Sequence, residues 1–198
     1  MSNDDTSLWQ SFLNGDKQSF ETIYTSYFKN LYEYGMRRTG NEELVKDCIQ
    51  DLFVKMWSNR KNISPTGNIK YYLLTSLKNH LINAGNSPAI TNTGSIEEAE
   101  KFSMEFTADT EYIRRQQDSR QSMQLLDALN QLTGRQKEVI YLRFFEGMSY
   151  EDIAQLMDIS VKGTYKLSYR ALDALRLILG ISKKDLLLLL MTFRIHMH

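Results

Sequence analysis

Basic and aromatic side chains recur on one side of a predicted helix near the C-terminal end of the chain. Lys162, Lys166 and Arg170 fall on one face together with Tyr169 when successive residues are separated by about 100°. Ammonium, guanidinium and phenol groups on one face can pair with phosphates and donate hydrogen bonds to base edges. The opposite face carries small or apolar residues suited to a core: Val161, Thr164, Ser168, Ala171 and Leu175. This division favours a helix that enters a DNA groove, with a solvated basic face as the simpler alternative.

The residues before this helix predict a helix-turn-helix. Ser149 is a suitable N-cap for a short helix over 150–157, and Asp152 completes an acidic version of the capping box. Ser160 can cap the basic helix over 161–178. Further candidates for contact with DNA lie around this face: Arg135, Lys137, Gly163 and Tyr165.

A second surface with nucleic-acid chemistry is predicted in the helix over residues 69–84. Its apolar residues group on one side, whereas Tyr72, Thr75 and Asn79 align on the other, next to Lys78. Aromatic, hydroxyl, amide and ammonium groups suit single-stranded DNA, because they can stack on bases, hydrogen-bond and pair with phosphates. The alternative role for this tyrosine-bearing face is packing within the protein. The preceding loop, residues 61–67, is short and polar and is constrained by Pro65.

The helix predicted over residues 42–60 combines carboxylates with large aromatic side chains. Its core face consists of Val45, Cys48, Ile49, Leu52 and Met56. Asp47, Gln50 and Asp51 point the other way, and Phe53 and Trp57 lie on the boundary. By themselves these residues describe a solvated acidic face beside a core that two aromatic side chains close.

Composition describes an ordinary soluble protein, with 42% hydrophobic and 24% charged residues among 198. The net charge of zero is unevenly distributed: residues 1–84 carry +1, residues 85–118 carry −4 and residues 119–198 carry +3. The single Cys48 argues against a disulfide framework and indicates a reducing compartment. The polar N-terminus and the short apolar run over 186–193 predict a cytoplasmic protein with neither a signal peptide nor a membrane span.

Nothing in the chain predicts catalysis. The three histidines have no cysteine or acidic partners at ligand spacing, so we expect no metal and no cofactor. A Gly-rich phosphate loop and a nucleophile elbow are both missing from the sequence, so an enzyme is the weakest class of function.

Helical periodicity dominates the chain, and no segment shows sustained strand alternation. Helices are predicted over residues 6–14, 17–38, 42–60, 69–84, 110–131, 134–146, 150–157, 161–178 and 183–194. Residues 85–107 are rich in Asn, Ser, Thr and Glu and are predicted to form a flexible acidic linker. The predicted fold is all-α, with a helical domain over 1–84, a linker and the start of the next helix over 85–118, a helix-turn-helix domain over 119–180 and an apolar tail over 181–198.

The order and spacing of these motifs resemble the extracytoplasmic-function (ECF) sigma factors, the small two-domain promoter-recognition subunits of bacterial RNA polymerase. In the second domain the resemblance depends on residues 132–139, 147–154 and 160–176, and in the first on residues 15–20, 24–31, 47–57 and 68–79. It covers roughly residues 8–83 and 119–179. Two independent motifs in the right order are far harder to obtain by chance than one.

The resemblance implies a division of work between the domains. The first, sigma region 2, would bind core polymerase through Asp47, Gln50, Asp51, Phe53 and Trp57. Its loop would capture a flipped-out base of the downstream promoter element and its last helix would read the neighbouring bases, with contacts from Lys61, Asn62, Ile63, Tyr72, Thr75, Lys78 and Asn79. The second, sigma region 4, would bind the duplex upstream element through Lys162, Gly163, Tyr165, Lys166, Tyr169 and Arg170, helped by Arg135 and Lys137.

The sequence departs from the family pattern at specific positions. Asp158 stands where the turn usually has glycine, which requires a left-handed backbone at a non-glycine residue. Thr164 and Ser168 occupy core positions that are usually apolar, which predicts weaker packing of the basic helix. The arginine usual just after Asn83 is missing, so the promoter sequence does not transfer from the family.

Two alternatives stay open. A helix-turn-helix regulator that works without polymerase would need an N-terminal sensor or dimerisation domain, where this chain has the sigma pattern instead. With three or four phosphate contacts on the basic helix, the isolated chain should bind duplex promoter DNA weakly at physiological salt. The tail over 182–198 would either fold back on the second domain or dock an anti-sigma protein, which is an expected partner.

Overall fold

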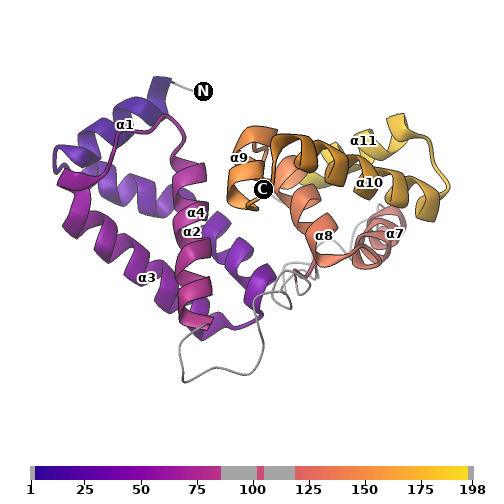
Figure 1. The fold of residues 1–198 in the computed structure, drawn as a ribbon, viewed down its shortest axis with the longest axis horizontal. Helices are drawn as coiled ribbons and strands as arrows, with labels where there is room; N and C mark the ends of the chain where they lie inside the picture. Colours follow the sequence, from indigo (N-terminus) through magenta and orange to yellow (C-terminus); the bar gives the residue numbers. More distant parts are fainter. Residues whose placement is uncertain (1–2, 86–101, 105–118, 196–198) are drawn as a thin grey trace. The chain divides into compact units, whose positions relative to one another are not determined.

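The computed structural model describes residues 3–85, 102–104 and 119–195, and the chain divides into two compact units, residues 1–94 and 95–198 (Figure 1). Every regular element among the described residues is a helix. The prediction of an all-α fold with two small helical domains is therefore confirmed. Most of the predicted linker, and the start of the helix predicted over 110–131, lie outside the described residues.

The first domain closely follows the predicted helices. It consists of α1 (Asn3–Leu13), α2 (Lys17–Thr39), α3 (Glu42–Asn59), the 3-10 helix η1 (Arg60–Asn62) and α4 (Ile69–Gly85). The Asp16 carboxylate accepts hydrogen bonds from the backbone N–H groups of Gln18 and Ser19, which fixes the start of α2. Gly40 ends that helix in the left-handed conformation, with φ of 64°.

The core of the first domain forms where α2, α3 and α4 pack together and α1 lies on α2. A Cβ atom added at Gly35 of α2 would lie 2.7 Å from Cγ1 of Val45 on α3, so a glycine permits this close helix crossing. Trp9 and Phe12 bring α1 into the same core, since both side chains are buried. This N-terminal helix is therefore part of the domain.

The second domain contains α7 (Ser119–Asn130), α8 (Gly134–Ile140), the π-helix η2 (Tyr141–Phe145), α9 (Tyr150–Leu156), α10 (Val161–Leu179) and α11 (Lys183–Ile195). The helix predicted over 134–146 is present, but it changes from an α-helix to a π-helix at Tyr141, where the backbone N–H of Glu146 donates to the carbonyl of Tyr141, five residues back. The wider turn accompanies burial of Tyr141, Leu142 and Phe145. Periodicity of apolar residues does not distinguish the two helix types here.

A short piece of the predicted linker belongs to the core of the second domain. Phe102 and Met104 are buried, and the ring of Phe102 lies 5.6 Å from that of Tyr141 at the start of η2. The tyrosine hydroxyl in turn donates to Glu146 over 2.7 Å, so this polar group is satisfied within the core. The linker prediction is therefore wrong at Phe102 and Met104, which are isolated apolar residues in a polar segment.

The C-terminal tail forms α11, which packs on α10 and η2. Leu186 and Leu190 are fully buried, whereas Leu188 and Met191 are 53% and 56% exposed. The tail thus folds back on the second domain, the first of the two alternatives. Across the helices that the structure describes, none is long and apolar enough to cross a bilayer.

Candidate nucleic-acid interface

The turn between α9 and α10 has the predicted helix-turn-helix caps. The Ser149 hydroxyl oxygen accepts from the backbone N–H of Asp152 at 3.0 Å, and the hydroxyl donates to the Asp152 carboxylate at 2.7 Å. Asp158 has φ of 55°, the left-handed conformation expected at that position. The Ser160 hydroxyl accepts from the backbone N–H of Gly163 at 3.0 Å. Local hydrogen bonds thus set the direction in which α10 leaves the turn.

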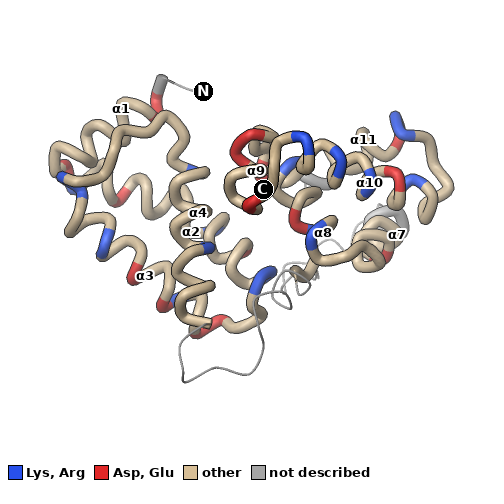
Figure 2. The backbone as a smooth tube through the Cα atoms, in the orientation of Figure 1, with Lys and Arg blue, Asp and Glu red and all other residues tan. Residues whose placement is uncertain are grey.

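The basic face of α10 points into solvent. Lys162, Lys166 and Arg170 are exposed, and Tyr165 and Tyr169 are 51% and 61% exposed. On the opposite face Thr164, Ser168, Ala171 and Leu175 are buried, while Val161 is partly exposed at the first turn. Figure 2 shows the lysine and arginine positions of α10 in blue. The face is therefore accessible to an anionic partner.

The two hydroxyl residues at core positions of α10 are buried and hydrogen-bonded. Thr164 donates to the carbonyl of Ser160 at 3.2 Å, and Ser168 shares a hydrogen bond of 3.3 Å with the hydroxyl of Tyr150. Buried hydroxyls with partners carry little desolvation cost. The weaker packing expected of this helix stays a prediction.

Side chains from outside α10 support its exposed face. The ring of Tyr150 lies 4.1 Å from the ring of Tyr165, and the Arg143 guanidinium covers Tyr150 at 4.7 Å. Lys183, at the start of α11, lies 5.3 Å from the Tyr169 ring. Sequence reasoning missed these three supporting residues, since only the fold brings them to α10.

Arg135 and Lys137 lie at the start of α8, apart from the α10 turn in sequence. Arg135 donates from Nη2 to the carbonyl of Met157 at 3.2 Å, which ties the start of α8 to the end of α9. The residue is otherwise exposed, so its remaining donors stay available for an anion. Lys137 is half-buried. Gly163 is also partly buried, and a Cβ atom there would lie 3.1 Å from the Ser160 hydroxyl oxygen that caps the helix.

In the first domain, the loop predicted to capture a base leads from η1 to α4. Lys61 and Asn62 are exposed, and Ile63 is half-buried. The Asn68 side chain accepts from the backbone N–H of Tyr71 at 3.0 Å and so caps α4. The polar side chains at the start of the loop can therefore reach a nucleic acid.

The row on α4 is less open than its periodicity predicts. Asn79 is exposed, but Tyr72 is half-buried against Trp9, with ring centroids 4.9 Å apart, and burial raises the pKa of its phenol. The hydroxyl oxygen of Thr75 is buried and makes no hydrogen bond with any described residue. Lys78 is half-buried and has a partner within the protein. The prediction of one open row is therefore wrong for Tyr72, which Trp9 of α1 partly covers, and for the buried hydroxyl of Thr75.

The acidic face of α3 is where the sequence places it, whereas its aromatic residues differ. Asp47, Gln50 and Asp51 are exposed. Phe53 is only 4% exposed and packs against Phe20 and Tyr24, so its placement on the boundary is wrong. Trp57 is half-buried, and the Arg60 guanidinium covers one face of its indole at 4.4 Å.

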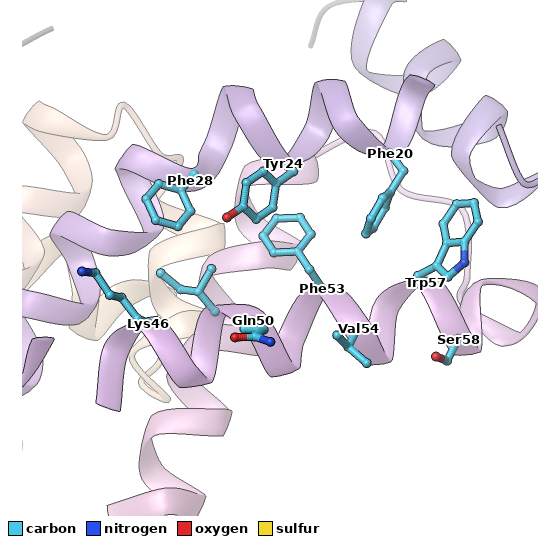
Figure 3. A pocket seen from close by; sticks show the side chains of 10 residues that line it. Phe20, Tyr24, Phe28, Lys46, Gln50, Phe53, Val54, Trp57 and Ser58 are labelled. Carbon is cyan, nitrogen blue, oxygen red and sulfur yellow. The ribbon is translucent and has the colours of Figure 1, made fainter. Parts of the chain in front are cut away.

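An aromatic groove of about 560 Å³ runs between α2 and α3. Figure 3 shows the aromatic side chains of the two helices facing one another across it. The groove is lined by Phe20, Tyr24, Phe28, Lys46, Ile49, Gln50, Phe53, Val54, Trp57 and Ser58. Sequence reasoning did not select Phe20, Tyr24 and Phe28 as site residues. Their spacing of four residues on one helix face was the signal that could have found them.

Comparison with known proteins matches both domains to one family. Residues 23–85 match sigma-70 region 2, and residues 122–175 match sigma-70, region 4. The RNA polymerase sigma factor YlaC of Bacillus subtilis is 26% identical over 156 residues, which cover 78% of this chain and 88% of that protein. The ECF RNA polymerase sigma-E factor of Escherichia coli is 25% identical over 181 residues, covering 86% and 92%.

The sigma factor RpoE from Bartonella quintana, solved with the anti-sigma factor NepR, shares the fold. Its TM-score is 0.55 at 21% identity, over 83% of this chain and 99% of that one. The two region matches lie in family order, one in each domain, and together cover more than half of the sequence. The chain therefore belongs to the ECF sigma factors of bacterial RNA polymerase. As such it is a transcription initiation factor that binds core polymerase and promoter DNA.

Proposed function

We propose that the exposed basic face of α10 binds the duplex upstream promoter element. The observation that carries this assignment is the sidedness of α10, with Lys162, Lys166 and Arg170 exposed over a buried face of four residues. Lys162 and Lys166 contact base edges or adjacent phosphates in the major groove, and Arg170 contacts phosphate. Gly163, Tyr165 and Tyr169 complete this surface, with Arg135 and Lys137 as flanking phosphate contacts.

In the first domain, the exposed start of the loop and the exposed end of α4 bind unpaired DNA of the downstream element. Lys61, Asn62 and Ile63 contact the flipped-out base and its phosphate, while Asn79 contacts neighbouring bases. Lys78 lies one position before Asn79, and its ammonium group pairs with the phosphate backbone of the DNA. Tyr72 and Thr75 act mainly as the support beneath this surface, since both are partly buried.

Core polymerase binds the first domain on α3. Asp47, Gln50 and Asp51 supply an exposed polar rim, and the groove beside them supplies apolar area. Phe53 and Trp57 contribute as walls of the groove. An apolar pocket ringed by polar groups is the usual form of an interface hot spot.

An anti-sigma protein is the expected regulator. A relative with the same fold was solved with an anti-sigma factor. On this chain, the exposed Leu188 of α11 lines a groove together with Gln124, Leu179 and Leu189, and Met191 is a second exposed apolar residue of the same helix. The exposed side of the folded-back helix is the candidate surface for such a partner, so charge changes at Leu188 and Met191 should weaken the complex.

Reconstitution with core polymerase tests the whole assignment. The chain, acting in the cytoplasm and without catalysis of its own, should co-migrate with core enzyme and open a promoter only in that complex. Failure to co-migrate would contradict the role of α3. Tight sequence-specific binding by the isolated chain at physiological salt would instead favour the polymerase-independent regulator, because the few cations on α10 predict weak binding alone.

A further inference from the structure

A buried tryptophan in α1 links that helix to the base-capture loop. The indole N–H of Trp9 donates to the backbone carbonyl of Ser64 at 3.2 Å. The same ring meets Tyr72 of α4 nearly edge-on, with centroids 4.9 Å apart. Trp9 is only 1% exposed, so it acts inside the protein. It lies before residues 23–85, the part of the chain that matches sigma-70 region 2.

The residue that precedes the loop is held as well. Arg60 lies over the indole of Trp57 at 4.4 Å, and its Nη1 donates to the Trp57 carbonyl at 2.8 Å. Between these two attachments, Lys61 and Asn62 are exposed, and Pro65 is exposed just after the second one. The first half of the loop is therefore held at Arg60 and at Ser64, with exposed polar side chains between these two points.

We propose that Trp9 is a positioning residue that shapes the loop before the base arrives. A flipped-out base loses its stacking, and a pocket compensates best when little of the binding free energy is used to order the loop. The hydrogen bond to Ser64 acts on the loop main chain, and the contact with Tyr72 fixes the neighbouring helix turn. The inference depends on the proposed role of the loop and adds α1 to it.

The test replaces the donor while keeping an aromatic ring. Trp9→Phe removes the indole N–H, and a second variant with 3-benzothienylalanine at position 9 keeps the bicyclic shape but also lacks the N–H. Each is assembled with core polymerase and bound to premelted fork DNA from a promoter that the wild-type holoenzyme transcribes. Each non-template base of the downstream element is then made abasic in turn, and the loss of affinity is measured.

For the wild type, removing the captured base should weaken binding roughly tenfold to a hundredfold, as expected when a stacked base is lost. Both Trp9 variants should lower that penalty by about threefold to tenfold, the usual effect of one hydrogen bond. Their affinity for core polymerase should stay unchanged. Val45→Ala serves as the matched control, because it removes buried volume at the α2–α3 crossing, away from the loop. It should keep the wild-type abasic penalty.

Two results would contradict the proposals in different ways. If the benzothienyl variant shows the full wild-type abasic penalty, Trp9 has only a structural role and this inference is wrong. If the wild type itself shows no penalty at any position, the loop does not capture a base, and the proposed function of the loop fails first.

Discussion

The two candidate DNA surfaces are built by different means. Before α10, Ser149 caps α9 and Ser160 caps α10, and the helical period then brings the basic residues of α10 to one exposed face. In the first domain, the loop and α4 depend on contacts with α1, more than fifty residues away in sequence. One surface is thus set by local hydrogen bonds and the other by tertiary packing.

This difference explains why sequence reasoning succeeds for one surface and errs for the other. Periodicity shows which residues share a helix face, but it does not show what covers that face. On α10 the polar face meets solvent, so the prediction of exposure is right. On α4, Trp9 of α1 packs against Tyr72 and partly covers it, so the same reasoning overestimates how exposed that face is.

The largest effect should come from Phe102, which tests how far the second domain depends on local signals. Phe102→Ala removes a ring packed on Tyr141 and should lower the free energy of unfolding of the second domain by about 3–5 kcal/mol. Both tryptophans lie in the first domain, so their fluorescence should be unchanged while circular dichroism shows the earlier transition. Leu188→Ala, at an exposed site, is the control. Equal stability of the two variants would show that α8 and η2 need no linker contact.

The next largest effect should be on duplex DNA binding by the basic face of α10. Lys162→Ala combined with Lys166→Ala should weaken holoenzyme binding to a duplex upstream element by about 2–4 kcal/mol and reduce the salt dependence by about two phosphate contacts. Lys184→Ala on the exposed start of α11 should change neither. An unchanged salt dependence in the double variant would show that these lysines do not meet DNA.

Two smaller effects should distinguish a packing role for Tyr72 from a DNA-contact role for Asn79 on α4. Tyr72→Ala should lower the stability of the first domain by about 1–3 kcal/mol, because it leaves a gap beside Trp9. Asn79→Ala should leave stability within about 0.5 kcal/mol, as is usual at the surface, yet weaken binding to premelted fork DNA. Denaturant unfolding measures the stability of each variant, and a binding assay measures the affinity of its holoenzyme for premelted fork DNA. The reverse outcome would mean that Tyr72 contacts DNA and that Asn79 is the structural residue.

The smallest effect should be a pH dependence of folding stability that arises from Asp16 at the start of α2. Hydrogen bonds from Ser19 hold the pKa of the Asp16 carboxyl below its ordinary value of 3.8. A lowered pKa in the folded state stabilises the fold above pH 3.8, and this contribution disappears as the pH falls through the lowered value. Thermal unfolding of wild type and Asp16→Asn at several pH values should show the difference between them shrinking toward acid pH. A constant difference would rule out this ionisation as its source.

Most of the fold and part of the site could be predicted. Helix boundaries in the first domain, the caps at Ser149 and Ser160 and the left-handed Asp158 all follow from local chemistry. The errors at Phe53 and Phe102 have another origin. Each is an apolar residue at the edge of a polar pattern, and its burial depends on a partner far away in the sequence: Tyr24 for the former and Tyr141 for the latter.

By itself the sequence determined the class of fold, the two-domain order, the family and the exposed basic face of α10, because turns, caps and helical period act over a few residues. Only the tertiary structure decided which aromatic side chains line the α2–α3 groove, that Tyr72 is covered and that Trp9 holds the loop. These features arise from close packing between helices distant in the chain, where the shape of each partner determines what remains exposed.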